Sequence, residues 1–207
     1  MPEKTPPARP LTPKGDRRAE SILSAATAVL ARDGFGGATL GRIAAEAGAE
    51  KRSILYYFGT RERLMVRVVH RLGGQIAETV RQATPALTDP HELLDAIVST
   101  TWAGVTSDPQ LVRAYFALVA GDVEAGEVDD ALATIKDIYR SLMRDQILAL
   151  HTAGWRPRGD VDNAANALFA LLRGYLLLWL EEGETALTDG GLDQFKSFVS
   201  AQFFPPE

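Results

Sequence analysis

The sequence of 207 residues contains no cysteine and only three histidines. Without cysteine, a disulfide framework, a thiol nucleophile, an iron–sulfur cluster and a thiolate zinc site are all excluded. The remaining candidates for metal or proton chemistry are His70, His91 and His151, and none of them lies three residues after a glutamate. The Glu-x-x-His pairs of a carboxylate-bridged di-iron bundle are therefore missing. We expect no catalytic residue, no metal site and no cofactor.

The N-terminal stretch lacks the apolar core of a signal peptide. The most apolar segment, residues 164 to 180, carries Asn166 and Arg173 in its middle, which argues against a membrane span. We expect a cytoplasmic protein without a membrane partner.

Charge is divided unevenly along the chain. Residues 1 to 71 contain 13 Lys and Arg against 7 Asp and Glu, a formal charge of +6. Residues 72 to 207 contain 9 against 20, a formal charge of −11. A basic segment favours a polyanionic partner, and an acidic segment is repelled by one. The alternative is an ordinary solvated surface with a modest basic excess.

Apolar residues recur at helical intervals, and no run is long enough to predict a sheet. Residues 1 to 15 contain five prolines, so we expect a disordered basic arm that is either an inert tail or a DNA contact. Beyond it, the caps and breakers predict an all-α fold of about nine helices. We expect these helices at about residues 16 to 33, 39 to 48, 50 to 58, 61 to 83, 89 to 106, 108 to 120, 127 to 153, 161 to 182 and 189 to 204.

Two short helices within residues 39 to 58 meet at Gly48, which accepts a positive φ without steric cost. This is the design of a helix-turn-helix, whose second helix presents its N-terminal side chains to the major groove. Ile43, Ile54 and Leu55 are expected to lock that helix onto its support. An αα-hairpin with merely solvated charges has the same spacing. The side chains left to reach outward are Lys51, Arg52, Ser53 and Tyr56.

Residues 25 to 64 contain a run of motifs at fixed offsets. They are Gly34-Phe35, Thr39, Ile43-Ala44, Ala47-Gly48, Tyr57-Phe58, Arg61 and Leu64. With these motifs the stretch closely resembles the N-terminal DNA-binding domain of the tetracycline-repressor (TetR) family of bacterial transcription regulators.

The resemblance implies roles for individual residues. Thr39, at a helix N-terminus, together with Tyr57 and Arg61, is expected to contact DNA phosphates. The candidates for base edges are the four outward side chains, with Arg or Lys to guanine as the favoured specific contact. Two positions depart from the family pattern: Glu50 stands where a Ser or Thr cap is frequent, and Leu55 where a tyrosine is frequent.

In the family, the last two helices pair with their copies in a partner subunit. The segment ALFALLRGYLLLWLEEG, residues 167 to 183, is apolar on most sides and resembles the first helix of that pair. A helix buried within a single subunit is the alternative. The expected interface residues of this homodimer are Leu168, Leu172, Tyr175, Leu176 and Trp179.

The family also implies a small-molecule cavity between the C-terminal helices, and aromatic walls suit an apolar or aromatic effector. Aromatic residues at helical spacing are often simply core. His151 and Arg173 could orient an anionic effector. The candidate cavity residues are Trp102, Tyr115, Phe116, Tyr139, Met143 and Phe169.

These expectations combine into three parts: a basic arm at 1–15, a helix-turn-helix domain at 16–60, and a ligand-binding and dimerisation domain at 61–207. The favoured function is a sequence-specific regulator that binds operator DNA with an inverted repeat, most simply a repressor released by a small-molecule effector. The alternatives are an all-α relative that acts as an interaction module, or an enzyme, without DNA binding.

Overall fold

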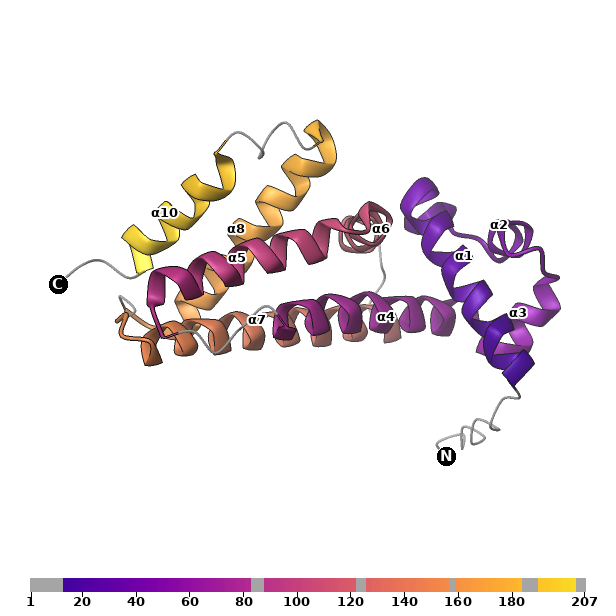
Figure 1. Ribbon diagram of the computed structural model, residues 1–207. Helices are drawn as coiled ribbons and strands as arrows, with labels where there is room; N and C mark the ends of the chain where they lie inside the picture. The colour runs from indigo at the N-terminus through magenta and orange to yellow at the C-terminus, as the bar shows by residue number, and fades with distance from the viewer. Residues whose placement is uncertain (1–12, 83–87, 122–125, 157–158, 184–189, 204–207) are drawn as a thin grey trace, which may run out of the picture.

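The computed structural model describes residues 13–82, 88–121, 126–156, 159–183 and 190–203, and every regular element within these ranges is a helix (Figure 1). In chain order they are α1 (Pro13–Gly37), α2 (Leu40–Glu46), α3 (Lys51–Phe58), α4 (Arg61–Gln82), α5 (Pro90–Thr106), α6 (Pro109–Val119), α7 (Glu127–Thr152), α8 (Val161–Glu182) and α10 (Gly191–Phe203). The predicted all-α fold is confirmed.

Four helices begin at the side-chain caps that the sequence predicts. Thr39 and Thr60 each accept a hydrogen bond from a backbone N–H in the first turn of α2 and α4. Asp89 and Asp108 each accept two such bonds at the start of α5 and α6. A cap of this kind stabilises a helix by about 1 kcal/mol, which is why the helix limits could be read from the sequence.

The first helix begins earlier than expected. Pro13–Gly15 are helical rather than part of the predicted arm, because proline is well suited to the first turn of a helix, where its missing N–H is not needed. The regular helix ends as predicted, at Gly34, whose φ of 73° breaks it. The rest of the predicted arm, residues 1–12, lies outside the described residues, as does the expected end of the fourth helix at residue 83.

The helices form a small unit and a large unit joined by α4 (Figure 1). α1, α2 and α3 gather at one end of the molecule, and α5 to α10 make up the rest. α4 extends from the small unit and packs along α7, while α1 packs against α6. The two units are therefore connected by two helix pairs.

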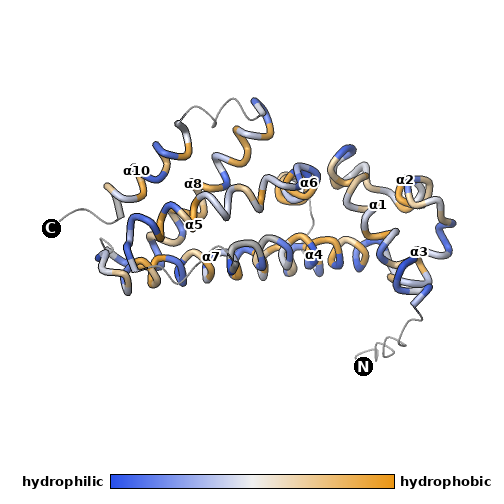
Figure 2. The backbone as a smooth tube through the Cα atoms, in the orientation of Figure 1, coloured by the Kyte–Doolittle hydropathy of each residue, from blue (hydrophilic) through white to orange (hydrophobic). Residues whose placement is uncertain are grey.

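α4 owes its position to an apolar stripe that is buried along its length. Leu64, Met65, Val68, Val69 and Leu72 are all buried in one hydrophobic core that extends from α1 to α10. Polar and apolar bands alternate along α4 and α7 in Figure 2, as expected for helices that bury one face. Burial of this stripe holds the two units together.

Gly73 lets α4 approach α7 closely. A Cβ atom on Gly73 would lie 2.5 Å from Cδ1 of the buried Ile135 on α7. The next residue, Gly74, is exposed and has no neighbour within 4 Å of such an atom. Gly73 therefore faces the packed contact with α7, whereas Gly74 faces open space.

We expect Gly73→Val to lower the free energy of unfolding by about 1–3 kcal/mol, because the new side chain overpacks the contact with Ile135. Gly74→Val is the matched control and should change stability by no more than about 0.5 kcal/mol. Urea denaturation followed by circular dichroism measures both. Equal effects of the two substitutions would contradict the close approach of α4 and α7.

Candidate nucleic-acid interface and ligand cavity

The α2–α3 unit is held together by a glycine turn and a buried apolar face. Gly48 has a φ of 53°, and the N–H of Ala49 donates to the carbonyl of Ala44 at 2.8 Å. Ile43 on α2 and Ile54 on α3 are fully buried. The geometry is that of a helix-turn-helix with α3 as the second helix.

Arg18 of α1 clamps this turn, a role that the sequence did not suggest. Its guanidinium donates to the carbonyl of Gly48 at 2.7 Å and to that of Ala47 at 3.3 Å. Carbonyls at a helix C-terminus lack intrahelical partners, and a charged donor satisfies them well. Because the contact joins residues about thirty positions apart, no local pattern could reveal it.

The outer face of α3 carries the predicted base-reading candidates. Lys51, Arg52 and Tyr56 are exposed, and Ser53 is half-buried. Leu55, expected to face inward, is 44% exposed, so that expectation is wrong. The reason is helical spacing: Leu55 lies four residues after Lys51 and shares its outward face, whereas Ile54 points to the core.

Glu50 and Arg52 form an ion pair at the start of α3. The Nε atom of Arg52 lies 2.6 Å from a carboxylate oxygen of Glu50. Glu50 occupies the N-cap position but makes no side-chain capping bond. Both side chains are largely exposed, so the pair contributes little to stability and an incoming anion can replace Glu50.

Two of the three predicted phosphate contacts keep an accessible side chain. Thr39 is exposed at the start of α2, where its hydroxyl accepts from the N–H of Arg42 at 3.4 Å. Tyr57 is half-buried and meets Tyr56 edge to face, with ring centroids 5.1 Å apart. Both side chains therefore remain available to a partner.

The side chain of Arg61, the third predicted phosphate contact, instead forms hydrogen bonds within the protein. Its Nε atom donates to the carbonyl of Ala38 at 2.9 Å, and a terminal nitrogen donates to the carbonyl of Phe35. The guanidinium carbon lies 4.6 Å from the centroid of the Phe35 ring. Arg61 therefore fastens the start of α4 to the end of α1, and a DNA phosphate would have to compete with these bonds.

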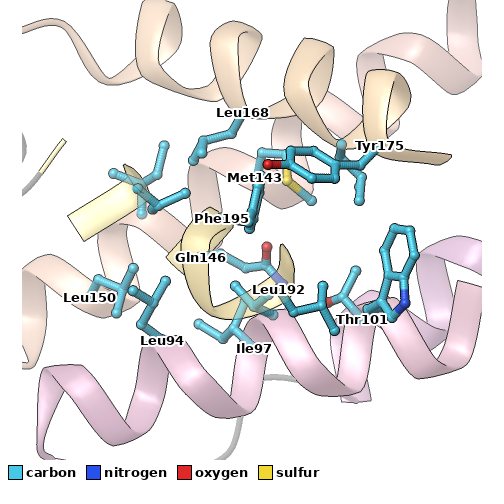
Figure 3. A pocket seen from close by; sticks show the side chains of 15 residues that line it. Leu94, Ile97, Thr101, Met143, Gln146, Leu150, Leu168, Tyr175, Leu192 and Phe195 are labelled. Atoms are coloured by element: carbon cyan, nitrogen blue, oxygen red, sulfur yellow. The ribbon is translucent and has the colours of Figure 1, made fainter. Parts of the chain in front are cut away.

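A cavity of about 60 Å³ lies between α5, α7, α8 and α10 (Figure 3). Of the predicted cavity residues, Trp102 and Met143 line it. Most of the wall is aliphatic, but the hydroxyl of Thr101 and the amide nitrogen of Gln146 are buried there without a hydrogen-bond partner. Sequence reasoning missed these two polar residues because each looks like an ordinary position of an amphipathic helix.

A second cavity, of about 30 Å³, brings together four of the predicted residues. Tyr115, Tyr139, Met143 and Phe169 line it, together with Arg173. Met143 and Leu172 border both cavities. Phe116 lines neither cavity and packs beside Tyr115, at 5.5 Å between ring centroids. His151 is exposed, with its Nδ1 atom 3.0 Å from the carbonyl of Trp155, and it lines neither cavity.

The face of α8 that is open differs from the predicted interface. Leu176 and Trp179 are buried within the subunit, against Val105 and Val112 of α5 and α6. Leu168, Leu172 and Tyr175 are partly buried and turn toward the cavity. Leu176 and Trp179 therefore belong to the inner face, because α8 covers α5, α6 and α7. Tyr175 also borders the hollow on the open side, beside Leu171 and Leu178. The apolar residues that remain accessible on the opposite side are Ala170, Leu171, Gly174, Leu177 and Leu178.

By length and composition alone, α8 could cross a membrane, with a mean hydropathy of 1.2 over its most apolar window. No other helix in the described ranges meets these criteria. Arg173 lies in the middle of α8, and the helix packs on α7. Core helices of water-soluble proteins meet the same criteria, so this feature is weak evidence for a membrane span.

Residues 22–68 match the family model described as bacterial regulatory proteins of the tetR family. The chain is 29% identical over 99 residues to the transcriptional repressor NicS of Pseudomonas putida, covering 48% of this chain and 47% of NicS. It is 25% identical over 160 residues to the transcriptional regulator BetI of Rhizobium meliloti, covering 76% of this chain and 75% of BetI. The match to NicS thus spans about half the length of that relative.

The fold as a whole is similar to that of a solved structure from Pseudomonas aeruginosa PAO1, described as a transcriptional regulator. The TM-score is 0.75 at 25% sequence identity, covering 92% of this chain and 91% of the other. Solved regulators of the tetR family also share the fold, for example one from Mesorhizobium loti with a TM-score of 0.71 at 20% identity, covering 93% of this chain and all of the other. The matched segment and its helix-turn-helix geometry lead to one conclusion: residues 22–68 are a segment of the tetR type of bacterial regulatory protein, and the chain as a whole is similar to transcriptional regulators in sequence and in fold.

Proposed function

We propose that this protein is a homodimeric repressor that binds an inverted-repeat operator and is released from it by a small-molecule effector. The observation that carries the proposal is the outer face of α3, where Lys51, Arg52 and Tyr56 are exposed on a helix held rigidly by the core and by Arg18. The relative NicS is a repressor by name, which supports this sign of regulation. A DNA target places the protein in the bacterial cytoplasm.

The candidate residues divide into those suited to phosphate contacts and those suited to base contacts. Phosphate contacts fix the position of a protein on the duplex, and base-edge contacts provide specificity. Thr39 and Tyr57 are suited to the first task, and Lys51, Arg52, Ser53 and Tyr56 to the second. The acidic Glu50 opposes a close phosphate, so the Glu50–Arg52 pair has to open when Arg52 reaches a guanine.

The accessible apolar strip of α8 supports a dimer. Leu177 is 44% exposed on α8, and Phe198 of α10 is also exposed. The absence of a Cβ on Gly174 lets another helix approach α8 closely, since nothing lies within 4 Å of that position. A two-fold axis would set this strip against its own copy, which requires two equivalent DNA half-sites.

Effector release is proposed to act through α4 and α6 together. α6 carries Tyr115 at the smaller cavity, and just beyond its end Gly121 meets Phe35, where a Cβ atom on Gly121 would lie 2.8 Å from that of Phe35. Phe35 is the residue that Arg61 grips at the start of α4. A shift of α5 or α8 at the cavity would move α6, which packs against both, and through Phe35 the small unit. The spacing of the two recognition helices of a dimer would then change. By linkage, the effector weakens DNA binding by the factor with which DNA weakens effector binding.

Arg52→Gln is expected to weaken binding to the DNA upstream of the protein's own gene by about 1–3 kcal/mol and to relax preference at one base pair. Glu50→Gln is expected to strengthen binding, because it removes a negative charge near the phosphates and frees Arg52. Fluorescence anisotropy titrations at several salt concentrations measure both, with a slope of roughly −0.9 per neutralised phosphate.

The control for these titrations is Arg140→Gln, which removes an arginine paired with Asp137 on the surface of α7. It should leave the Kd for DNA unchanged. A Kd that does not depend on salt would contradict DNA binding altogether. An Arg52→Gln protein that binds like the wild type would remove Arg52 from the base-reading set.

Leu177→Asp is expected to convert the dimer to monomers at micromolar concentration, because the interface would bury an unpaired carboxylate. Leu148→Asp is the matched control, since Leu148 on α7 is 40% exposed, close to the 44% of Leu177. Sedimentation velocity distinguishes the two states. A wild-type protein that sediments as a monomer would refute the proposed dimer.

A further inference from the structure

Arg173 of α8 is a cation among aromatic rings. Its guanidinium carbon lies 5.6 Å from the ring centroids of Tyr115 and Phe169 and 6.0 Å from that of Phe116. Its Nε atom is buried and has no hydrogen-bond partner. Within the described residues, no carboxylate lies within 4 Å of it. The rings stabilise the positive charge but do not neutralise it.

Two tyrosine hydroxyls share this environment. Tyr115 and Tyr139 are each more than nine-tenths buried, and both hydroxyls lack a hydrogen-bond partner. Burial raises the pKa of both phenols, although the charge of Arg173 partly offsets the rise for Tyr115. Both hydroxyls therefore remain protonated at neutral pH and can donate hydrogen bonds.

The three residues that carry these unused donors line one cavity, the smaller one of about 30 Å³. Buried polar groups in folded proteins are nearly always satisfied, so three orphans in one place indicate an absent acceptor. An anion with at least two oxygen atoms can pair with the charge of Arg173 and accept from several of these donors at once. A carboxylate meets both requirements, whereas a cation would be repelled and an uncharged amide would leave the charge unpaired.

The larger cavity, which adjoins the smaller one, indicates the chemistry of the rest of the ligand. It is lined almost entirely by apolar side chains, and Met143 and Leu172 separate it from the smaller one. The side chains of Thr101 and Gln146 offer polar contacts there (Figure 3). At about 60 Å³ it is smaller than an apolar cavity of roughly 150 Å³ that binds benzene, so a ligand of that size must push the walls apart. The widening would displace α5 or α8, as effector action requires.

We propose that the effector is a monocarboxylate with a compact apolar body, whose carboxylate binds Arg173, Tyr115 and Tyr139 and whose body enters the larger cavity. The inference rests on the proposed function only in the claim that the bound carboxylate regulates DNA binding. Binding of the carboxylate itself follows from the unpaired donors and the two adjoining cavities.

The test uses the full-length protein, with phenylacetate and octanoate as probes and phenylacetamide and octanamide as uncharged partners of the same shape. Calorimetry gives the Kd, and the fluorescence of Trp102, which lines the larger cavity, reports occupancy. We expect at least one acid to bind ten-fold or more tightly than its amide. The two acids distinguish an aromatic from an aliphatic body.

Variants assign the preference to the cavity. Arg173→Met should abolish the difference between acid and amide, and Tyr139→Phe, which keeps the ring, should weaken the acid several-fold while leaving the amide unchanged. Arg113→Met is the control, because Arg113 is an exposed arginine on α6. Circular dichroism checks folding, and Tyr139→Phe keeps the test decisive if Arg173→Met does not fold.

Equal affinity for acid and amide, or no binding of either acid at 10 mM, would overturn the inference, as would an unchanged preference in both Tyr139→Phe and a folded Arg173→Met. A parallel mobility-shift titration separates it from the proposed function. DNA binding without acid binding overturns the carboxylate site alone, and acid binding without DNA binding overturns the regulator alone. Where both occur, equal affinity of the acid for free and DNA-bound protein would mean that the two sites are not coupled.

Discussion

The structure depends on the burial of one apolar stripe of α4 against two different sets of helices. Near its start, Leu64 and Met65 belong to the core that α1 and α3 share, and farther along Leu72 lies in the part of that core shared with α7. Each buried side chain of this size gains about 1.5–3 kcal/mol from removal of its surface from water. Neither unit can shift against the other without disturbing this stripe.

In the small unit, two arginines add hydrogen bonds between helices to the burial of apolar side chains. Arg18 binds the carbonyls at the end of α2, and Arg61 binds those at the end of α1. Charge-assisted bonds to carbonyls that would otherwise face water position α3 as a rigid body. Rigidity matters for DNA readout, since a recognition helix must present its side chains at a fixed depth and angle.

In the large unit, by contrast, several polar groups around Arg173 have no hydrogen-bond partner. Its helices bury ample apolar surface, yet they leave donors on Arg173, Tyr115 and Tyr139 without acceptors. Such groups cost stability, and a protein can carry them where burial elsewhere offsets the cost. The small unit therefore satisfies its polar groups and holds its shape, while the large unit retains unsatisfied groups where a ligand could change its shape.

The sequence by itself determined the helices and the helix-turn-helix, because caps, glycine turns and apolar spacing act over a few residues. The predicted boundary between residues 60 and 61 stays a prediction, since α4 serves both units. Tertiary structure decided which face of a helix is covered: Leu55 turned outward, and Leu176 and Trp179 turned toward α5 and α6. It also decided what Arg18, Arg61 and Arg173 do. A helix with apolar residues on most sides does not specify its inner face, and a long charged side chain finds its partner only when distant segments meet.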